Sequence, residues 1–194
     1  MVKIILASKS KVRKEILDKN NIITQVMHSN VDEDIVKKSL IKENVSPKKI
    51  SQNLAELKAN KVSNVRENIL VLGADSVIDL DGELISKPAS RGEAMEILKK
   101  LNGRKHKLVS SVCISKNGSM IWNYTDMATL TMKKMSETDL QKYLEKITDE
   151  SLFAYNVYQI EGEGRNLFSN IEGDQDTIMG LPIKEIKQYL SNYK

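Results

Sequence analysis

The sequence predicts an α/β domain with a mixed central β-sheet flanked by helices. Two short apolar runs, at residues 2–6 and 69–72, are typical of buried parallel strands, and helical patterns lie between them. Asp81-Gly82 and Asn117-Gly118 each separate two strand-like segments, and both dipeptides suit the left-handed torsions of a two-residue hairpin turn. Parallel strands and antiparallel hairpins in one chain predict a mixed sheet.

Length and composition indicate one domain that spans residues 1–194. Hydrophobic residues make up 40% of the chain, enough for a proper core, and no internal repeat or low-complexity linker divides it. No stretch approaches the roughly 20 apolar residues of a membrane span, and the apolar run at the N-terminus is too short for a secretory signal. We therefore expect a cytoplasmic protein with no membrane partner.

The ionisable residues restrict the ligand. Cys113 is the single cysteine and His28 and His106 are the two histidines, which excludes an intrachain disulfide, a cysteine zinc site and a histidine-rich metal centre. We expect His106 and Cys113 to be structural. The net charge of +4 suits polyphosphates, but acids and lysines are interspersed and aromatics make up only 5% of the chain. A small phosphorylated ligand therefore fits better than nucleic acid.

The first strand leads into a helix that begins among cations. Ser8 and Ser10 follow the strand, and either hydroxyl is a candidate helix cap. Lys9, Lys11, Arg13 and Lys14 crowd the helix N-terminus, where the helix dipole disfavours positive charge. A bound anion explains this arrangement, so we expect a phosphate cradle that includes the two hydroxyls, backbone N–H groups and Arg13.

A second strand, at residues 22–27, precedes the acidic cluster 31–34. This cluster has three possible interpretations: an exposed turn, a helix cap or a site for a hard cation. The sequence alone favours the helix cap. Ser46-Pro47 then begins a helix with an apolar stripe through Ile50, Leu54, Leu57 and Val62. Lys58 lies beside this stripe, and such lysines usually extend their ammonium to water.

The apolar run 69–72 is expected to end at Gly73, which puts Asp75 just past a buried strand. A hairpin follows, with Lys87 after its return strand. Because a hairpin brings its ends together, Asp75 and Lys87 should lie close at one edge of the sheet. For this pair alone, a salt bridge at a strand end is the simplest explanation.

The rest of the chain continues the alternation of helices and strands. Ser90 caps a helix that ends at Asn102-Gly103, residues 107–134 form a long hairpin, and a second capped helix covers residues 136–147. Residues 155–180 are rich in glycine and acids without a predicted element. Leu181-Pro182 leads into a final helix.

Seven motifs in order resemble the Maf family of nucleotide pyrophosphatases. They are LASKSKVRKEIL, VDE, LAELKA, GADSVIDLDGELISKP, SRGEAMEILKKLNGRKH, YQIEGEG and GDQDTIMGLPI, and they are spread along the chain essentially from end to end. The resemblance implies an elongated, two-lobed α/β fold of the kind found in Ham1 inosine triphosphatases, with a cleft between the lobes. It also implies hydrolysis of (d)NTPs, non-standard or surplus ones, to (d)NMP and pyrophosphate with Mg²⁺ or Mn²⁺.

The resemblance assigns roles to particular residues. Asp75 matches the catalytic carboxylate that activates water, and Glu33 joins it as a metal ligand. The positions that match the family's substrate and phosphate contacts are Ser8, Ser10, Arg13, Lys58 and Lys87. These roles agree with the needs of phosphoryl transfer, which are a positioned water, cations around the phosphate oxygens and a carboxylate.

Three further positions select the base in that family, and here they are Val12, Ser76 and Glu161. The chain departs from the family where it has Ser10-Lys11-Val12-Arg13 in place of Ser-Pro-Arg-Arg or Ser-Pro-Trp-Arg. Glu161 resembles the subgroup that acts on 7-methyl-GTP, but that subgroup's tryptophan and glutamine are absent from the other two positions. The alternatives are therefore a 7-methyl-GTP pyrophosphatase, or a non-catalytic nucleotide- or nucleic-acid-binding regulator of cell division. From resemblance alone we also expect a homodimer.

Overall fold

The computed structural model describes residues 3–193, and in these residues the chain forms a seven-stranded sheet. The strands are β1 (Ile4–Leu6), β2 (Thr24–Val26), β3 (Leu70–Leu80), β4 (Glu83–Ile85), β5 (Lys105–Lys116), β6 (Ser119–Met132) and β7 (Phe168–Glu172). The helices are α1 (Lys11–Lys19), α2 (Glu33–Lys42), α3 (Pro47–Ser63), α4 (Arg91–Leu101), α5 (Glu137–Lys146), α6 (Asp149–Tyr155), α7 (Gln175–Ile178) and α8 (Ile183–Asn192), with a 3-10 turn η1 (Glu163–Leu167).

The sheet is mixed, as predicted. Its order is β2-β1-β3-β5-β6-β7, and β4 pairs with β3. β1 runs parallel to β2 and β3, while all other pairs are antiparallel. Both predicted hairpin turns are present. Their central residues, Asp81, Gly82, Asn117 and Gly118, all have the positive φ that such turns require.

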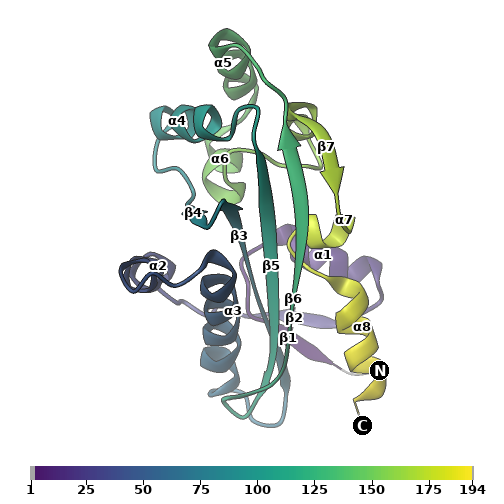
Figure 1. Cartoon of the computed structure of the whole chain (residues 1–194). Coiled ribbons are helices and arrows are strands. Elements are labelled where there is room, and N and C mark those ends of the chain that lie inside the picture. The colour runs from purple at the N-terminus through teal and green to yellow at the C-terminus, as the bar shows by residue number, and fades with distance from the viewer. Residues whose placement is uncertain (1–2, 194) are drawn as a thin grey trace.

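The long strands β3, β5 and β6 connect two halves of an elongated molecule (Figure 1). On one face of β3, Leu70, Leu72 and Ala74 pack into an apolar cluster with β1, α1 and α8. Further along the same face, Ile78 and Leu80 pack into a second cluster with α4, α5 and α6. Each half therefore has its own core, which confirms the expected two lobes.

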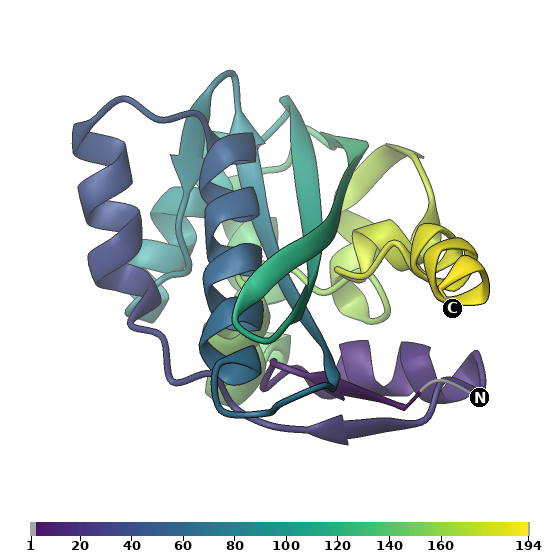
Figure 2. The same ribbon diagram turned by 90° about the horizontal axis from the view of Figure 1, so that it is seen from below.

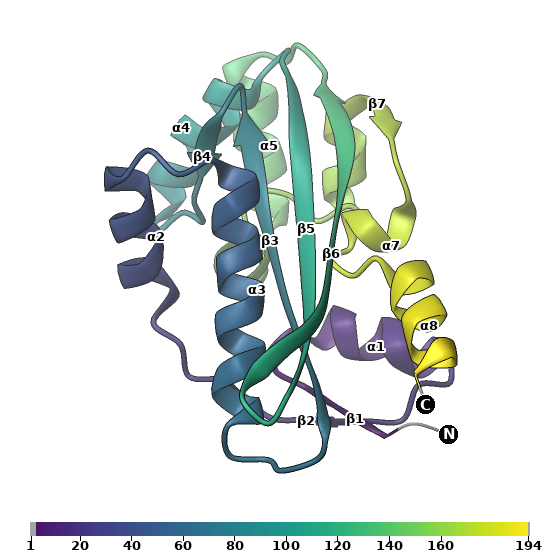
Figure 3. The ribbon, with the colours of Figure 1, turned by 60° about the horizontal axis from the view of Figure 1, so that its bottom comes forward.

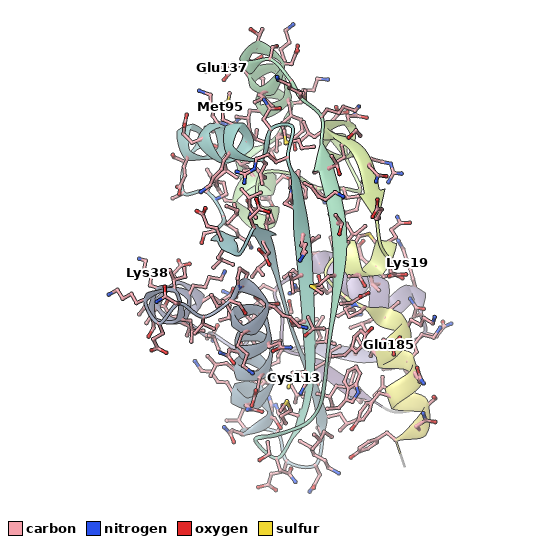
Figure 4. All side chains as sticks on the ribbon, viewed as in Figure 1. Lys19, Lys38, Met95, Cys113, Glu137 and Glu185 are labelled. Carbon is pink, nitrogen blue, oxygen red and sulfur yellow. The ribbon has the colours of Figure 1, made fainter. Side chains whose placement is uncertain are left out.

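The opposite face of β3 and β5 is covered by α3. Figure 2 shows α3 and α8 on opposite sides of the long strands. Cys113 is buried against Ala55 and Ala59 of α3, and Figure 4 shows it on β5, near that helix. His106 is buried in the core, with its Nε2 2.9 Å from the Tyr158 hydroxyl oxygen. Cys113 thus has the predicted core position, and the burial of His106 agrees with the structural role expected for it.

Most helices begin where the sequence indicated. Ser10, Asp32, Ser46, Ser90 and Ser136 each accept a hydrogen bond from the backbone N–H three residues further on. The acidic cluster 31–34 therefore forms a cap, as favoured. No helix in residues 3–193 has both the length and the apolar character that crossing a membrane demands.

Two sequence predictions were wrong. β3 does not end at Gly73 but continues unbroken to Leu80, so Asp75 lies in the middle of a strand and not after one. The segment 155–180, for which no element was predicted, contains β7, which pairs with the last residues of β6. A strand at a sheet edge with an exposed polar face has weak apolar alternation, and this explains the omission.

Candidate active site

A cavity of about 470 Å³ lies at a gap in the sheet edge, between the two lobes. β1 pairs with β3 only at residues 70–72, and β4 pairs with β3 only at residues 78–80. Among residues 3–193, no strand pairs with residues 73–77 on this edge. The cavity is lined instead by the start of α1, by α2, α3 and the end of β4, and by residues 156, 158–161 and 178–180.

Asp75 is buried in this gap beside a buried lysine. The Asp75 side chain faces α3, where Lys58 Nζ lies 2.8 Å from its Oδ1. Asp75 is 3% exposed and Lys58 is 6% exposed. Lys58 therefore does not extend to water as such lysines usually do, because its ammonium ends on a carboxylate inside the protein.

Gly73 explains why α3 comes so close to β3. It lies two residues before Asp75 and so faces the same helix. A Cβ atom at this position would be 2.1 Å from the carbonyl oxygen of Ala55 and 2.9 Å from the Cβ of Ala59. The missing side chain lets the helix backbone approach the strand, which brings Lys58 within reach of Asp75.

Glu33, the first residue of α2, completes an array of alternating charges. Its Oε1 lies 2.9 Å from Lys58 Nζ, and its Oε2 lies 3.7 Å from Lys37 Nζ. Burial opposes ionisation of Glu33, but Lys58, Lys37 and Lys87 outweigh it and lower the pKa of this carboxyl. Glu33 is therefore held as a carboxylate at neutral pH.

Lys87 lines the same cavity, just after β4. Burial lowers its pKa; Glu33 and Asp75 oppose this shift, while Lys37 and Arg13 reinforce it. Asp75 and Lys87 thus share one cavity, as the hairpin argument predicted. The ion pair formed by Asp75 Oδ1, however, is with Lys58.

Arg13 reaches from α1 across the gap to three other segments. Its Nε donates to the Gly180 carbonyl at 2.9 Å, and its Nη1 donates to the Ala74 carbonyl at 3.1 Å and to Ser8 Oγ at 3.3 Å. Its Nη2 donates to Ser76 Oγ at 3.0 Å. The positive charge of Arg13 is thereby fixed in the cavity wall.

The serines of the predicted cradle make local hydrogen bonds. Ser10 Oγ caps α1 by accepting the N–H of Arg13 at 3.3 Å, which is the structural alternative raised above. Ser8 Oγ accepts the N–H of Ser10 at 3.2 Å as well as the Arg13 bond. Both residues line the cavity, so contact with a phosphate stays a prediction for them.

Val12, Ser76 and Glu161, the predicted specificity residues, also line the cavity. Because side chains alternate along a strand, Ser76 points to the face of β3 opposite Asp75. Its hydroxyl lies 2.9 Å from Ser110 Oγ and accepts the Arg13 bond. Glu161 is exposed. Roles of these residues in base selection stay predictions.

The carboxylates of Asp75 and Glu33 are the candidate ligands for a divalent metal ion in the cavity. Asp75 Oδ2 is buried and has no hydrogen-bond partner among the described residues, so one strong oxygen ligand is available. Residues 3–193 contain no group of three or more His, Cys, Asp or Glu side chains suited to a metal. Mg²⁺ and Mn²⁺ keep several waters and bind substrate phosphates in addition to one or two carboxylates, so Asp75 and Glu33 would be enough, and their role as metal ligands stays a prediction.

Sequence reasoning missed Lys37 and a buried polar chain behind Arg13. The spacing of Glu33 and Lys37, four residues apart on a helix, was a usable signal. In the polar chain, Ser110 Oγ donates to the Thr177 carbonyl at 2.8 Å, and Thr177 Oγ1 donates to Asp126 Oδ2 at 2.7 Å. Ser110 lies among apolar residues that share its face of β5, which was the only local signal for this chain.

The chain is similar in sequence to known proteins. Residues 3–193 match the model of a family described as Maf-like protein. A nucleoside triphosphate pyrophosphatase of Pelagibacter ubique (strain HTCC1062) is 68% identical over 100% of both chains. A 7-methyl-GTP pyrophosphatase of Brucella abortus biovar 1 (strain 9-941) is 34% identical over 94% of this chain and 92% of its own.

The fold also has a counterpart among solved structures. A HAM1 protein from Coxiella burnetii has a TM-score of 0.56 and 13% identity, with 100% of both chains covered. At this level of identity the likeness bears on the fold alone. It confirms the predicted architecture.

Proposed function

The chain belongs to the family of Maf-like proteins, and from this premise we propose that it is a nucleoside triphosphate pyrophosphatase. The reaction cleaves the α–β anhydride of a (d)NTP and gives (d)NMP and pyrophosphate. The observation that carries the proposal is the free, buried Oδ2 of Asp75 in a cavity lined by Arg13, Lys58 and Lys87. A carboxylate that can accept a proton from water, surrounded by cations, suits hydrolysis of a polyphosphate.

In this mechanism each residue has a defined task. Asp75 Oδ2 accepts the proton of the attacking water, while Lys58 holds Oδ1 and so fixes the orientation of the carboxylate. Arg13 and Lys87 stabilise negative charge on the phosphate oxygens. Asp75 and Glu33 would hold a Mg²⁺ or Mn²⁺ ion, which when bound supplies further neutralisation of phosphate charge.

Asp75→Asn tests the catalytic assignment. The amide keeps the shape of the side chain but accepts protons poorly, so pyrophosphate release should fall by about 10²–10⁴-fold with nucleotide binding retained. Asp81→Asn is the matched control, because it makes the same change in the β3–β4 turn, outside the cavity, where Asn is equally suitable. Equal activity of the two variants would remove Asp75 from the mechanism.

A panel of nucleotides, assayed with Mg²⁺ and Mn²⁺, tests the substrate. We propose that the physiological substrates are non-standard or surplus nucleotides in the cytoplasm. 7-Methyl-GTP belongs in the panel as a second candidate, because Glu161 places a carboxylate at the cavity and a positively charged methylated purine would be attracted to it. Wild-type protein that binds nucleotides but hydrolyses none of them would favour the non-catalytic regulator instead.

A further inference from the structure

Helix α2 is packed loosely yet contributes two side chains to the cavity. All of its residues are described and none is buried, and Ile35 and Ile41 are 66% and 45% exposed. Figures 1 and 3 show that α3 lies between α2 and the sheet. Despite this position, the side chain of Lys37 is only 13% exposed, because it points into the cavity beside Glu33.

Lys37 ends the row of charges that starts at Asp75. The row runs from Asp75 through Lys58 and Glu33 to Lys37, with separations of 2.8, 2.9 and 3.7 Å between the charged atoms. Asp75 marks the place of water attack. Lys37 is therefore displaced from the reacting phosphorus toward the outer helix.

The cations of the cavity differ in how firmly the protein holds them. Arg13 makes four hydrogen bonds, and Lys58 lies between two carboxylates at hydrogen-bond distance. Lys37 has a longer contact, 3.7 Å, with one carboxylate, so its ammonium can turn to a ligand at small cost. It also repels Lys87, which lines the same cavity, and a polyanion that contacts both lysines would relieve that repulsion.

We propose that Lys37 binds the phosphates that leave as pyrophosphate. The proposal rests on the proposed function, because it takes Asp75 as the point of attack on the α-phosphate. A triphosphate with its α-phosphate beside Asp75 then extends along the row of charges, and its outer phosphates meet Lys37 and Lys87. α2 would therefore contact the substrate phosphates through Lys37, and the metal ion through Glu33.

The test compares Lys37→Gln with a matched variant on the same helix, Lys38→Gln. Lys38 is exposed and lies on the outer side of α2 in Figure 4, so this variant removes the same charge from the same helix without changing the cavity. Calorimetry would measure binding of inorganic pyrophosphate, UMP and GMP at saturating Mg²⁺. Lys37→Arg, which keeps the charge, serves as the rescue.

Lys37→Gln should weaken pyrophosphate binding about tenfold or more, the effect of losing a charge-assisted hydrogen bond. UMP and GMP binding should change less than about twofold, Lys37→Arg should recover most of the loss, and Lys38→Gln should match the wild type. An equal loss in Lys38→Gln, an equal loss for the monophosphates, or unchanged pyrophosphate binding would each overturn the proposal. So would a higher Mg²⁺ requirement with normal pyrophosphate affinity, since Lys37 would then act only through Glu33.

These measurements separate this inference from the proposed function. If the wild type hydrolyses nucleotides and Lys37→Gln binds pyrophosphate normally, the assignment of Lys37 fails alone. If the wild type hydrolyses none of the panel, the proposed function fails, whatever the lysine variants bind.

Discussion

Replacing Gly73 with alanine should damage both stability and catalysis by moving one helix. The added Cβ would lie 2.1 Å from the Ala55 carbonyl oxygen and 2.7 Å from the Ala59 backbone nitrogen. Non-bonded atoms prefer about 3.5 Å or more, so α3 must retreat from the sheet by roughly 1 Å. Helix backbone cannot yield as a flexible side chain would, and overpacking of this kind costs about 1–3 kcal/mol or more.

The same shift would reach the active site. α3 carries Lys58, whose Nζ lies 2.8 Å from Asp75 Oδ1, and a displacement of about 1 Å in a catalytic group can cost about 10²-fold in rate. We therefore expect Gly73→Ala to lower the melting temperature by about 3–10 °C and kcat/KM for the hydrolysed nucleotide by about 10²-fold.

Thermal unfolding and steady-state pyrophosphate release would measure the two effects. Gly92→Ala is the control, because the atom nearest to its new Cβ would be Ser90 Oγ at 3.9 Å and alanine favours the helix. That variant should be as stable as the wild type or more so, with normal activity. A Gly73→Ala protein indistinguishable from Gly92→Ala would refute the close-approach argument.

Two further predictions concern pH and substrate choice. Burial lowers the pKa of His106 to about 4 from its usual 6.5. Between pH 6.5 and pH 4, the histidine therefore binds a proton in the unfolded chain but not in the folded protein. The free energy of unfolding should thus fall by up to about 3 kcal/mol as pH drops from about 6.5 to 4, and urea denaturation of His106→Gln should lack this part of the slope; an identical slope would contradict it. Glu161→Gln should lower kcat/KM for GTP relative to UTP by about three- to tenfold, because a carboxylate accepts two guanine N–H groups but one from uracil; equal effects on both nucleotides would exclude this contact.

Local patterns predicted most of the elements of this fold. Helix caps such as Ser46 and Ser90, and the turns at Asp81-Gly82 and Asn117-Gly118, depend on residues close together in sequence, so they were identifiable without the structure. The predicted strand end at Gly73 was wrong because a glycine can either end a strand or allow a neighbouring helix to pack closely against it. Only the position of α3 distinguishes these cases, and that position is set by residues far away in the chain.

In the candidate site, too, the residues were identified from the sequence but most of their contacts were not. Asp75, Glu33, Arg13, Lys58 and Lys87 were identified as a charged set, largely from ordered motifs, and all of them line one cavity. Apart from the Glu33–Lys37 pair within α2, their partners were not predictable. Lys58 is buried against two carboxylates from other segments of the chain. Arg13 donates to Gly180, which is 167 residues away in sequence. No local periodicity encodes such contacts.

The gap between β1 and β4 allows one strand to supply both sides of the site. Adjacent residues on a strand point to opposite faces, so Asp75 meets Lys58 on the α3 side while Ser76 meets Arg13 on the side of the two apolar clusters. If a neighbouring strand paired with residues 73–77, it would occupy the edge where Arg13 reaches the Ala74 carbonyl. A shift of β3 by one residue would exchange Asp75 and Ser76 between faces and bury a carboxylate away from its lysine. The pairing of β3 with β5 from Val71 to Asp79 prevents this shift, so the antiparallel sheet behind the cavity sets the positions of its charges.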